Sequence, residues 1–364
     1  MSGAPRLDGI AFFGGGTGGH VFPGIAVAER ARERFPDCEI VFFRTGRTVE
    51  DRAFAGRDFE VRILELGAPG RRPSGWLRYG RGVSRGARAI RARLGRGRWA
   101  AFGLGGYASV PGILAARARR VPLILLEQNR VAGRANLLLA PFAAAVACSF
   151  PDTRIRPGRR AVTGNPVRRE VLRAAAARRA RPADGARRTV LVVGGSQGAH
   201  GLNEALRRAL PGLRDLAEKI RFTHLAGDAD KEDMEKAYRE EGFEAEVYGY
   251  SERLPELMAR ADLAIGRAGG TTLAEIAVVG LPAILVPYPY HRDLHQRRNA
   301  EAFVEAGAAR ILEERDLDAG SLRKLFDETL APGTLEAMER GAFALARPEA
   351  ADAVLDLALE VLRT

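Results

Sequence analysis

Two glycine-rich segments, one near the start of each half of the chain, have the composition of phosphate-binding turns. Residues 14–19 read GGGTGG and residues 194–199 read GGSQGA, and each separates an apolar run from a helix-compatible stretch. Glycine lets backbone N–H groups approach a phosphate closely, and the amino end of the following helix favours negative charge. Either segment can therefore cradle a diphosphate, although a tight turn that needs glycine only for its geometry is the simpler alternative for any single glycine.

His20 follows the first glycine-rich segment directly. Because histidine titrates near neutral pH, a histidine at the mouth of a phosphate-binding turn can act as a general base. We take His20 as the candidate catalytic residue, with a purely structural role as the alternative.

Polar residues follow several other apolar runs, where the strands of a parallel sheet would open to a ligand. Residues 103–111 form another glycine-rich turn, and the amide of Asn129 can fix sugar hydroxyls. In the second half, a turn of glycine and threonine at residues 267–272 precedes Glu275, whose carboxylate can accept both hydroxyls of a ribose or merely cap a helix. Gln296 lies at the start of a later helix-compatible stretch and is expected to face the same site.

The composition is that of a globular protein of two domains. Hydrophobic residues make up 46% and charged residues 28% of the 364 residues. Cys38 and Cys148 have neither metal-ligand nor CxxC spacing, so we expect buried thiols in a reducing compartment. No secretory signal and no stretch long enough to span a membrane is recognisable, which predicts a soluble or peripheral protein.

Apolar runs alternate with helix-compatible stretches along the whole chain. This alternation predicts an α/β protein with two Rossmann-like, doubly wound parallel-sheet domains that face each other across a cleft. We expect an N-terminal domain over residues 1–167, a linker over residues 168–188 and a C-terminal domain over residues 189–344. Strands are expected at residues 9–13, 39–45, 59–66, 100–104, 121–126, 144–150, 189–193, 221–226, 245–250, 263–266, 283–287 and 309–312.

Residues 67–100 contain ten arginines and no acidic residue. Apolar side chains recur among them at three- or four-residue spacing, at Trp76, Tyr79, Val83, Ala87, Ile90 and Leu94. The pattern predicts an amphipathic basic helix. Its apolar stripe either packs on the core or meets anionic lipid, and nucleic acid is the weaker option because no nucleic-acid motif accompanies the charge.

Taken together, the motifs resemble those of the MurG family of peptidoglycan glycosyltransferases in their order and spacing. The matching segments are GGTGGH at residues 15–20, GGYxSxP at 105–111, EQN at 127–129, TGNPVR at 163–168, GGSQGA at 194–199, RAGxxTxxE at 267–275 and HQxxNA at 295–300. The resemblance extends over residues 9–315.

The resemblance implies a GT-B fold whose C-terminal domain holds UDP-N-acetylglucosamine and whose N-terminal domain holds a lipid-linked acceptor, with a final helix over residues 345–364 returning to the N-terminal domain. It implies an inverting transfer, without metal or cofactor, of N-acetylglucosamine to the C4 hydroxyl of undecaprenyl-diphospho-N-acetylmuramyl-pentapeptide. The implied donor contacts are Thr17, Gly18, Gly19, Asn129, Arg168, Ser196, Ser251, Gly270, Thr271, Thr272, Glu275 and Gln296. The implied acceptor contacts are Gly16, His20, Gly105, Gly106, Tyr107 and Ser109.

The same resemblance implies a peripheral protein at the cytoplasmic face of the cell membrane, with an anionic membrane surface and other cell-wall synthesis proteins as partners. Three alternatives stay open: an enzyme with another lipid acceptor such as diacylglycerol, a UDP-N-acetylglucosamine 2-epimerase, and a non-catalytic nucleotide-binding protein. A nicotinamide or flavin enzyme is disfavoured, although Gly14, Gly16 and Gly19 satisfy GxGxxG, because the second strand ends at Arg44 and Thr45 without an acidic residue.

Overall fold

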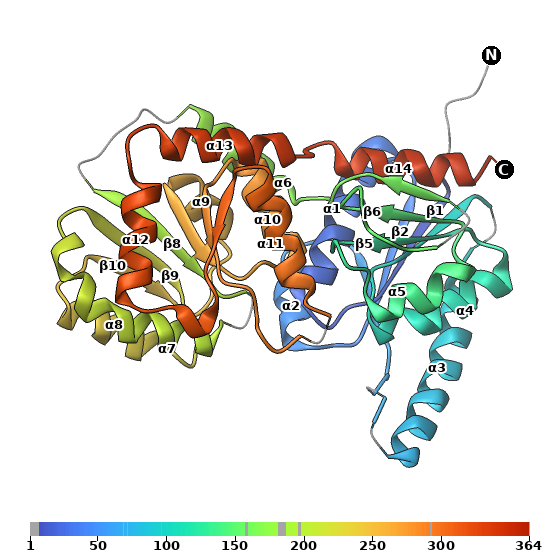
Figure 1. Ribbon diagram of the computed structural model, residues 1–364. Coiled ribbons are helices and arrows are strands. Elements are labelled where there is room, and N and C mark those ends of the chain that lie inside the picture. The colour runs from blue at the N-terminus through green and yellow to red at the C-terminus, as the bar shows by residue number, and fades with distance from the viewer. Residues whose placement is uncertain are drawn as a thin grey trace. The chain divides into compact units, whose positions relative to one another are not determined.

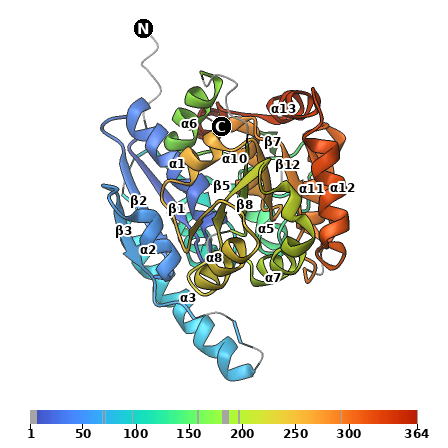
Figure 2. The ribbon, with the colours of Figure 1, turned by 90° about the vertical axis from the view of Figure 1, so that its left-hand side faces the viewer.

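The computed structural model describes residues 7–67, 69–70, 72–95, 97–156, 159–180, 187–195, 198–291 and 293–363. The chain divides into two compact units. The N-terminal unit comprises Met1–Arg168 together with Glu349–Thr364, and the C-terminal unit comprises Arg169–Pro348. Each unit is built on one parallel sheet that is covered by helices on both faces (Figure 1 and Figure 2).

The N-terminal unit contains a seven-stranded sheet in the order β3-β2-β1-β4-β5-β6-β7. Its strands are β1 (Gly9–Phe13), β2 (Glu39–Arg44), β3 (Glu60–Ile63), β4 (Trp99–Gly103), β5 (Leu123–Glu127), β6 (Ala145–Cys148) and β7 (Arg160–Val162). Its helices are α1 (Gly18–Arg34), α2 (Thr48–Phe54), α3 (Pro73–Arg93), η1 (Tyr107–Ser109), α4 (Val110–Arg119), α5 (Arg134–Leu139), η2 (Ala140–Phe142) and α14 (Ala350–Val361). The edge strand β7 was not predicted, because it is only three residues long and largely exposed.

Each face of this sheet has its own hydrophobic core. On one face Phe12 stacks between Phe42 and Phe102 of the neighbouring strands, with ring centroids 4.5 and 5.1 Å apart. Side chains alternate along a strand, so Phe13 and Phe43 point to the opposite face. Strands buried on both sides need helices on both sides: α1 and α14 cover the first core, and α3 and α4 cover the second.

Helix α3 is the predicted amphipathic basic helix. Its apolar stripe packs on the core through Val83, Ile90 and Leu94, as an ordinary surface helix would. Near its start, however, the side chains of Trp76 and Leu77 are each 58% exposed. This end of α3 projects beyond the other helices of its unit (Figure 1). Within the described part of the chain, no helix is both long and apolar enough to cross a membrane.

The C-terminal unit contains a six-stranded sheet in the order β10-β9-β8-β11-β12-β13. Its strands are β8 (Arg188–Val193), β9 (Ile220–Leu225), β10 (Ala245–Tyr248), β11 (Leu263–Gly266), β12 (Ala283–Leu285) and β13 (Ala309–Ile311). Its helices are α6 (Arg169–Arg179), α7 (His200–Ala209), η3 (Leu210–Leu216), α8 (Lys231–Glu240), α9 (Leu254–Arg260), α10 (Gly270–Val279), α11 (His295–Glu305), η4 (Glu314–Asp316), α12 (Ala319–Thr329) and α13 (Thr334–Leu345). The six strands predicted for this half are all present.

The linker expected over residues 168–188 is in part a helix of the C-terminal unit. Residues 169–179 form α6, which packs on α9 and α10. Alanine has the highest helix propensity, and three small apolar side chains are buried on one side of this helix, those of Val171, Ala174 and Ala175. Both cysteines are buried free thiols, as predicted, and burial raises the pKa of Cys38 to about 12 and that of Cys148 to about 11.

Candidate functional site

The order of strands identifies one ligand-binding position in each sheet. Chain order reverses between β1 and β4 in the N-terminal unit, and between β8 and β11 in the C-terminal unit. Ligands of open parallel sheets bind beyond the carboxyl ends of the strands at this point. The glycine-rich segments at residues 14–19 and 104–109 follow β1 and β4, and residues 194–195 and 267–269 follow β8 and β11. All four predicted turns therefore lie at the two reversal points.

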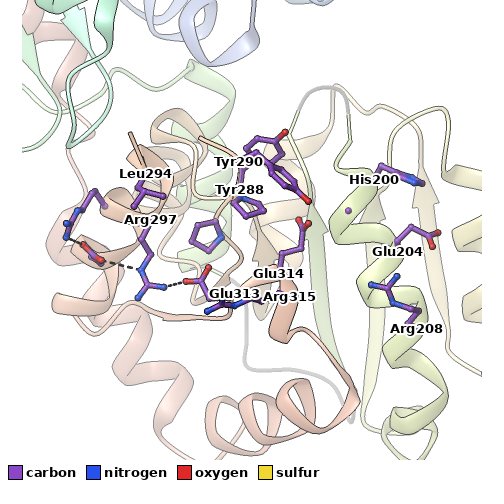
Figure 3. A pocket seen from close by; sticks show the side chains of 15 residues that line it. His200, Glu204, Arg208, Tyr288, Tyr290, Leu294, Arg297, Glu313, Glu314 and Arg315 are labelled. Atoms are coloured by element: carbon purple, nitrogen blue, oxygen red, sulfur yellow. Dashed lines mark hydrogen bonds and ion pairs between the residues drawn. The ribbon is translucent and has the colours of Figure 1, made fainter. Parts of the chain in front are cut away.

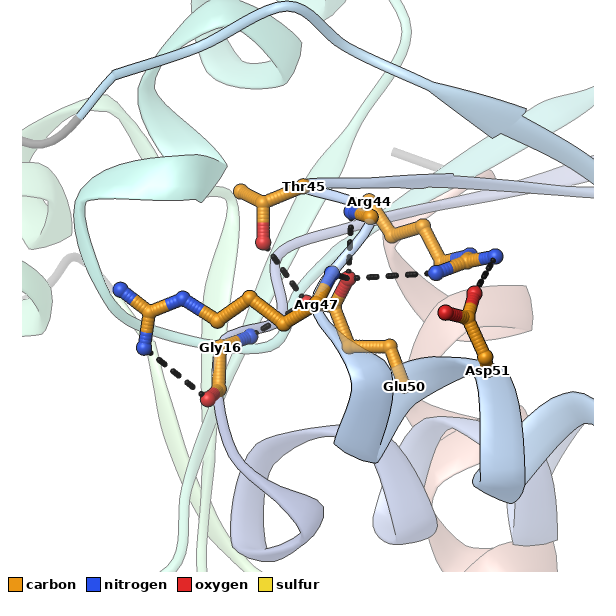
Figure 4. Close-up of polar contacts among 7 residues, drawn as sticks. Gly16, Arg44, Thr45, Arg47, Glu50 and Asp51 are labelled. Atoms are coloured by element: carbon orange, nitrogen blue, oxygen red, sulfur yellow. Dashed lines mark hydrogen bonds and ion pairs between the residues drawn. The ribbon is translucent and has the colours of Figure 1, made fainter.

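The first turn is held by a carboxylate that we did not single out from the sequence. Glu50, at the start of α2, is completely buried, and its Oε1 accepts hydrogen bonds from the Gly16 N–H and from the Thr45 hydroxyl at 2.9 Å (Figure 4). Arg47 lies above the same turn, where its Nη1 donates to the Gly16 carbonyl at 3.2 Å. The sequence offered one signal for Glu50: a glutamate shortly after a strand and three residues into a helix start, as in a capping box.

The structure brings His20 together with Thr17 and with the second glycine-rich turn. His20 lies in the first turn of α1, half-buried, with its Nδ1 3.1 Å from the Thr17 hydroxyl. A side chain at Gly105 would stand 3.2 Å from the His20 ring, so the ring lies close to that backbone. The candidate base is therefore flanked by two turns at the carboxyl edge of the N-terminal sheet.

The other expected acceptor residues differ in what they can offer a ligand. Tyr107 is half-buried, and its hydroxyl accepts a hydrogen bond from Arg47 at 3.2 Å. Ser109 is completely buried, and its hydroxyl is shared between the carbonyl oxygens of Phe13 and Gly105 at 2.9 and 2.8 Å. The observed contacts of Ser109 shape the turn, whereas Tyr107 and Gly106 are partly exposed.

Two expected donor contacts on the N-terminal unit, Asn129 and Arg168, lie against the buried Glu127 and the partly buried Phe22. Glu127 is 2% exposed and accepts hydrogen bonds from both the N–H and the side-chain amide of Asn129, at 3.0 and 3.3 Å. Burial raises the pKa of Glu127, and the hydrogen bonds that it accepts oppose that shift. The guanidinium of Arg168 lies over the ring of Phe22, 4.1 Å from its centroid. Thr17 and Gly19 are exposed, and Gly18 is the buried first residue of α1.

In the C-terminal unit, the start of α10 carries four of the expected donor residues. Gly270 is its first residue, and its first turn has no acidic residue and no capping side chain. The helix dipole and the amino-terminal N–H groups of such a turn favour an anion. Thr271 is 7% exposed and Thr272 is half-buried, and the Glu275 carboxylate follows one turn later at 3% exposure. This arrangement suits a diphosphate at the helix start and a polar group near Glu275.

The remaining expected donor residues lie in separate loops of the same unit. Gln296, in the first turn of α11, accepts a hydrogen bond through Oε1 from the Tyr288 N–H at 3.0 Å, which turns its NH₂ group away from that backbone. Ser251 follows β10, and its hydroxyl accepts from the Arg253 N–H at 3.1 Å. Ser196 lies outside the described residues.

A pocket of about 750 Å³ opens beside these loops in the C-terminal unit (Figure 3). None of the predicted site residues lines it. Its walls include Tyr288 and Tyr290 after β12, His200 at the start of α7, and the ion pair between Arg297 and Glu313. The pocket was not predicted from the sequence, because helix α7 and the segment from Pro287 to Arg315, which line it, are distant along the chain. Nowhere do the described residues gather three potential metal ligands.

Comparisons with known proteins match both halves of the chain. Residues 10–148 match the glycosyltransferase family 28 N-terminal domain and residues 189–354 match the glycosyltransferase family 28 C-terminal domain. A UDP-N-acetylglucosamine–N-acetylmuramyl-(pentapeptide) pyrophosphoryl-undecaprenol N-acetylglucosamine transferase of Anaeromyxobacter dehalogenans is 41% identical over 361 residues, which covers 96% of this chain and 92% of that protein. A protein of the same name from Geobacter sulfurreducens is 37% identical over 353 residues, with 94% and 96% covered.

A comparison with solved structures points to the same family. MurG of Acinetobacter baumannii has a TM-score of 0.76 at 29% identity, over 97% of this chain and 99% of its own. A UDP-GlcNAc 2-epimerase from Neisseria meningitidis has a TM-score of 0.68, but at 14% identity it shares the fold alone.

Two Rossmann-like units with glycine-rich turns at their strand reversals define a glycosyltransferase of the GT-B fold, which confirms the predicted fold class. The 41% identity over nearly the whole length also identifies the family within this fold. The chain belongs to the MurG family, as its motifs predicted.

Proposed function

We propose that this protein transfers N-acetylglucosamine from UDP-N-acetylglucosamine to the C4 hydroxyl of a lipid-linked N-acetylmuramyl-pentapeptide. The observation that carries the proposal is the 41% identity, over 96% of the chain, to a relative whose name states this donor and this acceptor. The turns of both units supply the anion-binding groups that two diphosphate-containing substrates require.

The N-terminal unit is proposed to bind the acceptor. His20 takes the proton of the acceptor's C4 hydroxyl as the hydroxyl oxygen attacks the anomeric carbon of the donor. The new glycosidic C–O bond forms on the opposite face from the breaking bond to UDP, so the configuration at that carbon inverts. The two turns that flank His20 hold the acceptor through Gly105, Gly106 and Tyr107.

The C-terminal unit is proposed to bind the nucleotide sugar. The diphosphate lies at Gly270, Thr271 and Thr272, where the helix dipole stabilises the negative charge that develops on departing UDP. Glu275 accepts hydrogen bonds from the ribose hydroxyls, and the amide of Gln296 contacts the sugar. Further donor contacts are carried over from the family resemblance alone, at Thr17, Gly18, Gly19, Asn129, Arg168, Ser196 and Ser251.

A UDP-release assay with the purified chain tests this function. Release that requires both UDP-N-acetylglucosamine and the lipid-linked N-acetylmuramyl-pentapeptide supports the proposal. Equal turnover with diacylglycerol as acceptor would instead make it a different lipid glycosyltransferase. Conversion of the donor to its 2-epimer without acceptor would make it an epimerase, and UDP-sugar binding without any turnover would leave only a binding protein.

We also propose that the protein works as a peripheral protein at the cytoplasmic face of the cell membrane, among other cell-wall synthesis proteins. The exposed side chains of Trp76 and Leu77 would enter the interface while neighbouring arginines such as Arg78 and Arg81 meet anionic headgroups, each worth about 1 kcal/mol. Co-sedimentation with vesicles of anionic lipid should therefore fall with added salt, with neutral lipid and in the double variant Trp76→Ala, Leu77→Ala. Vesicle binding that is unchanged by salt, by neutral lipid and by the double variant would contradict the proposed membrane contact.

A further inference from the structure

The buried carboxylate of Glu50 joins the first glycine-rich turn to the loop between β2 and α2. Its Oε2 accepts hydrogen bonds from the N–H groups of Gly46 and Arg47 at 2.7 and 3.1 Å, in addition to the two donors on Oε1. A buried carboxylate is costly unless such donors satisfy it. A side chain at Gly15 would overlap Oε1, so glycine at this position is what lets the carboxylate reach the turn. Glu50 therefore fixes the backbone of both loops.

These contacts change which groups of the turn can meet a phosphate. The N–H of Gly16 donates to Glu50, and its carbonyl accepts from Arg47. The Gly16 backbone, expected from the sequence to help cradle an anion, is thus already occupied on both sides. The positive group that the structure places at this point of the turn is the Arg47 guanidinium.

Arg47 differs from its neighbour Arg44 in how its charge is balanced. Arg44 pairs with Glu50 at 3.5 Å and with Asp51 at 2.6 Å, so two carboxylates neutralise it. Within the described ranges, the guanidinium of the exposed Arg47 donates to two neutral oxygens, those of the Gly16 carbonyl and the Tyr107 hydroxyl, both at 3.2 Å. Among the residues that the structure describes, no carboxylate lies within ion-pair distance of Arg47. In Figure 4 the guanidinium of Arg47 lies beside the carbonyl of Gly16, on the side away from the guanidinium of Arg44.

We propose that Arg47 is a further acceptor-binding residue, held above the first glycine-rich turn by Glu50, and that it contacts the diphosphate of the lipid-linked acceptor. An arginine has five N–H donors in a planar fork that matches phosphate oxygens, and two contacts leave donors over. Of its two partners, Tyr107 is assigned to the acceptor by the proposed function, and Gly16 is an acceptor contact that the family resemblance implies. The inference rests on that function, and Glu50 acts as a positioning residue.

Acceptor kinetics of three arginine variants test the proposal. Arg47→Ala should raise the KM for the lipid-linked acceptor about 10- to 100-fold, the range for losing hydrogen bonds between charged groups, with kcat and the donor KM unchanged. Arg47→Lys should raise the acceptor KM less than Arg47→Ala, because lysine keeps the positive charge but lacks the planar set of N–H donors. Arg52→Ala, which removes an exposed arginine from the same helix, is the matched control and should leave all three parameters unchanged.

Two soluble acceptor analogues, one linked through a diphosphate and one through a single phosphate, separate contact from loop shaping. If Arg47 contacts the diphosphate, the preference of the wild type for the diphosphate analogue should fall at least tenfold in Arg47→Ala. If Arg47 only shapes the turn, Arg47→Ala should lower kcat/KM equally for both analogues, and the proposal is overturned. Should Arg47→Ala fold poorly, the same comparison with Arg47→Lys, expected to lose part of that preference, decides.

Glu50→Gln tests the positioning role. The amide can no longer accept from all of the N–H groups that face Glu50, so the acceptor KM should rise in parallel with that of Arg47→Ala. In the double variant with Arg47→Ala, Glu50→Gln should then add little to the acceptor KM, whereas fully additive effects would refute the coupling. A wild-type chain without acceptor-dependent UDP release would refute the proposed function, while an active wild type with an unchanged acceptor KM in Arg47→Ala would refute this inference alone.

Discussion

Arg47 in the N-terminal unit and Arg267 in the C-terminal unit both lie near carboxyl ends of strands, yet their surroundings are opposite. Arg267 is 8% exposed, pairs with Glu314, and donates to the carbonyl oxygen of Val286 at 3.1 Å. Arg47 is exposed, and its partners among the described residues are neutral. The neutralised arginine holds the ends of β11, β12 and β13 together, whereas the arginine without a carboxylate keeps its charge for a ligand.

The two arginines differ in whether a carboxylate pairs with them, and this difference separates structural charges from functional ones in this fold. A charge neutralised by carboxylates of its own unit, such as that of Arg44 or Arg267, fixes loops and stabilises the fold. A polar group that stays partly exposed beside a turn, such as Arg47 or His20, remains able to act on a substrate. Substitutions of the first kind should change stability, and substitutions of the second kind should change kinetics.

The largest expected effect concerns His20. If it is the general base, His20→Ala should lower kcat by about 10² to 10⁴ and leave the donor KM nearly unchanged. Steady-state kinetics at saturating acceptor measure this. His200→Ala, which removes an exposed histidine of the C-terminal unit, is the control and should keep the wild-type kcat. A normal kcat with only a raised acceptor KM would show that His20 binds the acceptor without taking its proton.

The next effect concerns the partner of Arg267. Glu314→Ala leaves a largely buried guanidinium without its carboxylate, so it should lower the free energy of unfolding by about 3 kcal/mol. Asp316→Ala, in the same 3-10 turn, removes an exposed ion pair with Arg315 and should cost about 0.5 kcal/mol or less. Urea unfolding compares the two midpoints. Equal stability of both variants would mean that the neutralised Arg267 does not stabilise the fold.

A smaller effect is expected for Glu275, which tests the donor side. Glu275→Ala should lower kcat/KM for UDP-N-acetylglucosamine by about one to two decades, because hydrogen bonds between a carboxylate and the ribose hydroxyls are lost. The acceptor KM should not change. Glu235→Ala, on the exposed face of α8, is the control. Unchanged donor kinetics in a folded Glu275→Ala variant would remove Glu275 from the donor site.

Most of the fold could be predicted from the sequence, because its signals are local. Apolar runs that alternate with helix-compatible stretches predicted twelve of the strands, and the spacing from Trp76 to Leu94 predicted α3. The edge strand β7 gave no such signal, since three largely exposed residues carry no hydrophobic pattern. The helix α6 was read as a linker because its arginines and alanines look like a solvated connection until α9 and α10 cover its small apolar side.

The candidate site was predictable where backbone chemistry dictates residue type and not where distant side chains meet. Glycine-rich turns can be recognised from their composition alone. The order of strands then places these turns at the reversal points, where ligands of parallel sheets bind. Arg47 could not be distinguished from the chain's other arginines, because its role depends on Gly16, 31 residues away, and on Tyr107, 60 residues away. For Ser109 the motif predicted a ligand contact, whereas burial directs its hydroxyl to two backbone carbonyls.

The smallest effect concerns a partly exposed ion pair that anchors the end of α3 to the edge of the sheet. Arg93 donates through Nε to both carboxylate oxygens of Glu60, at 2.9 and 3.0 Å. Hydrogen bonds from Arg93 and, to a smaller extent, from Arg62 lower the pKa of Glu60 from 4.5 to about 2, against the opposing effect of burial. A carboxyl whose pKa is lower in the folded state stabilises the protein above its unfolded pKa, and this contribution is lost as the pH falls through the folded pKa.

Glu60→Gln should therefore lower the free energy of unfolding by about 1 kcal/mol at pH 7, a figure reduced for solvent screening because the Glu60 side chain is 33% exposed. The difference from the wild type should shrink between pH 4.5 and pH 2, which urea unfolding at a series of pH values measures. Kinetics should stay unchanged, because this charge is balanced within its own unit. A deficit that persists undiminished toward pH 2 would assign the loss to packing of α3 instead of to the ion pair, and a kinetic change would place a neutralised charge among the functional ones.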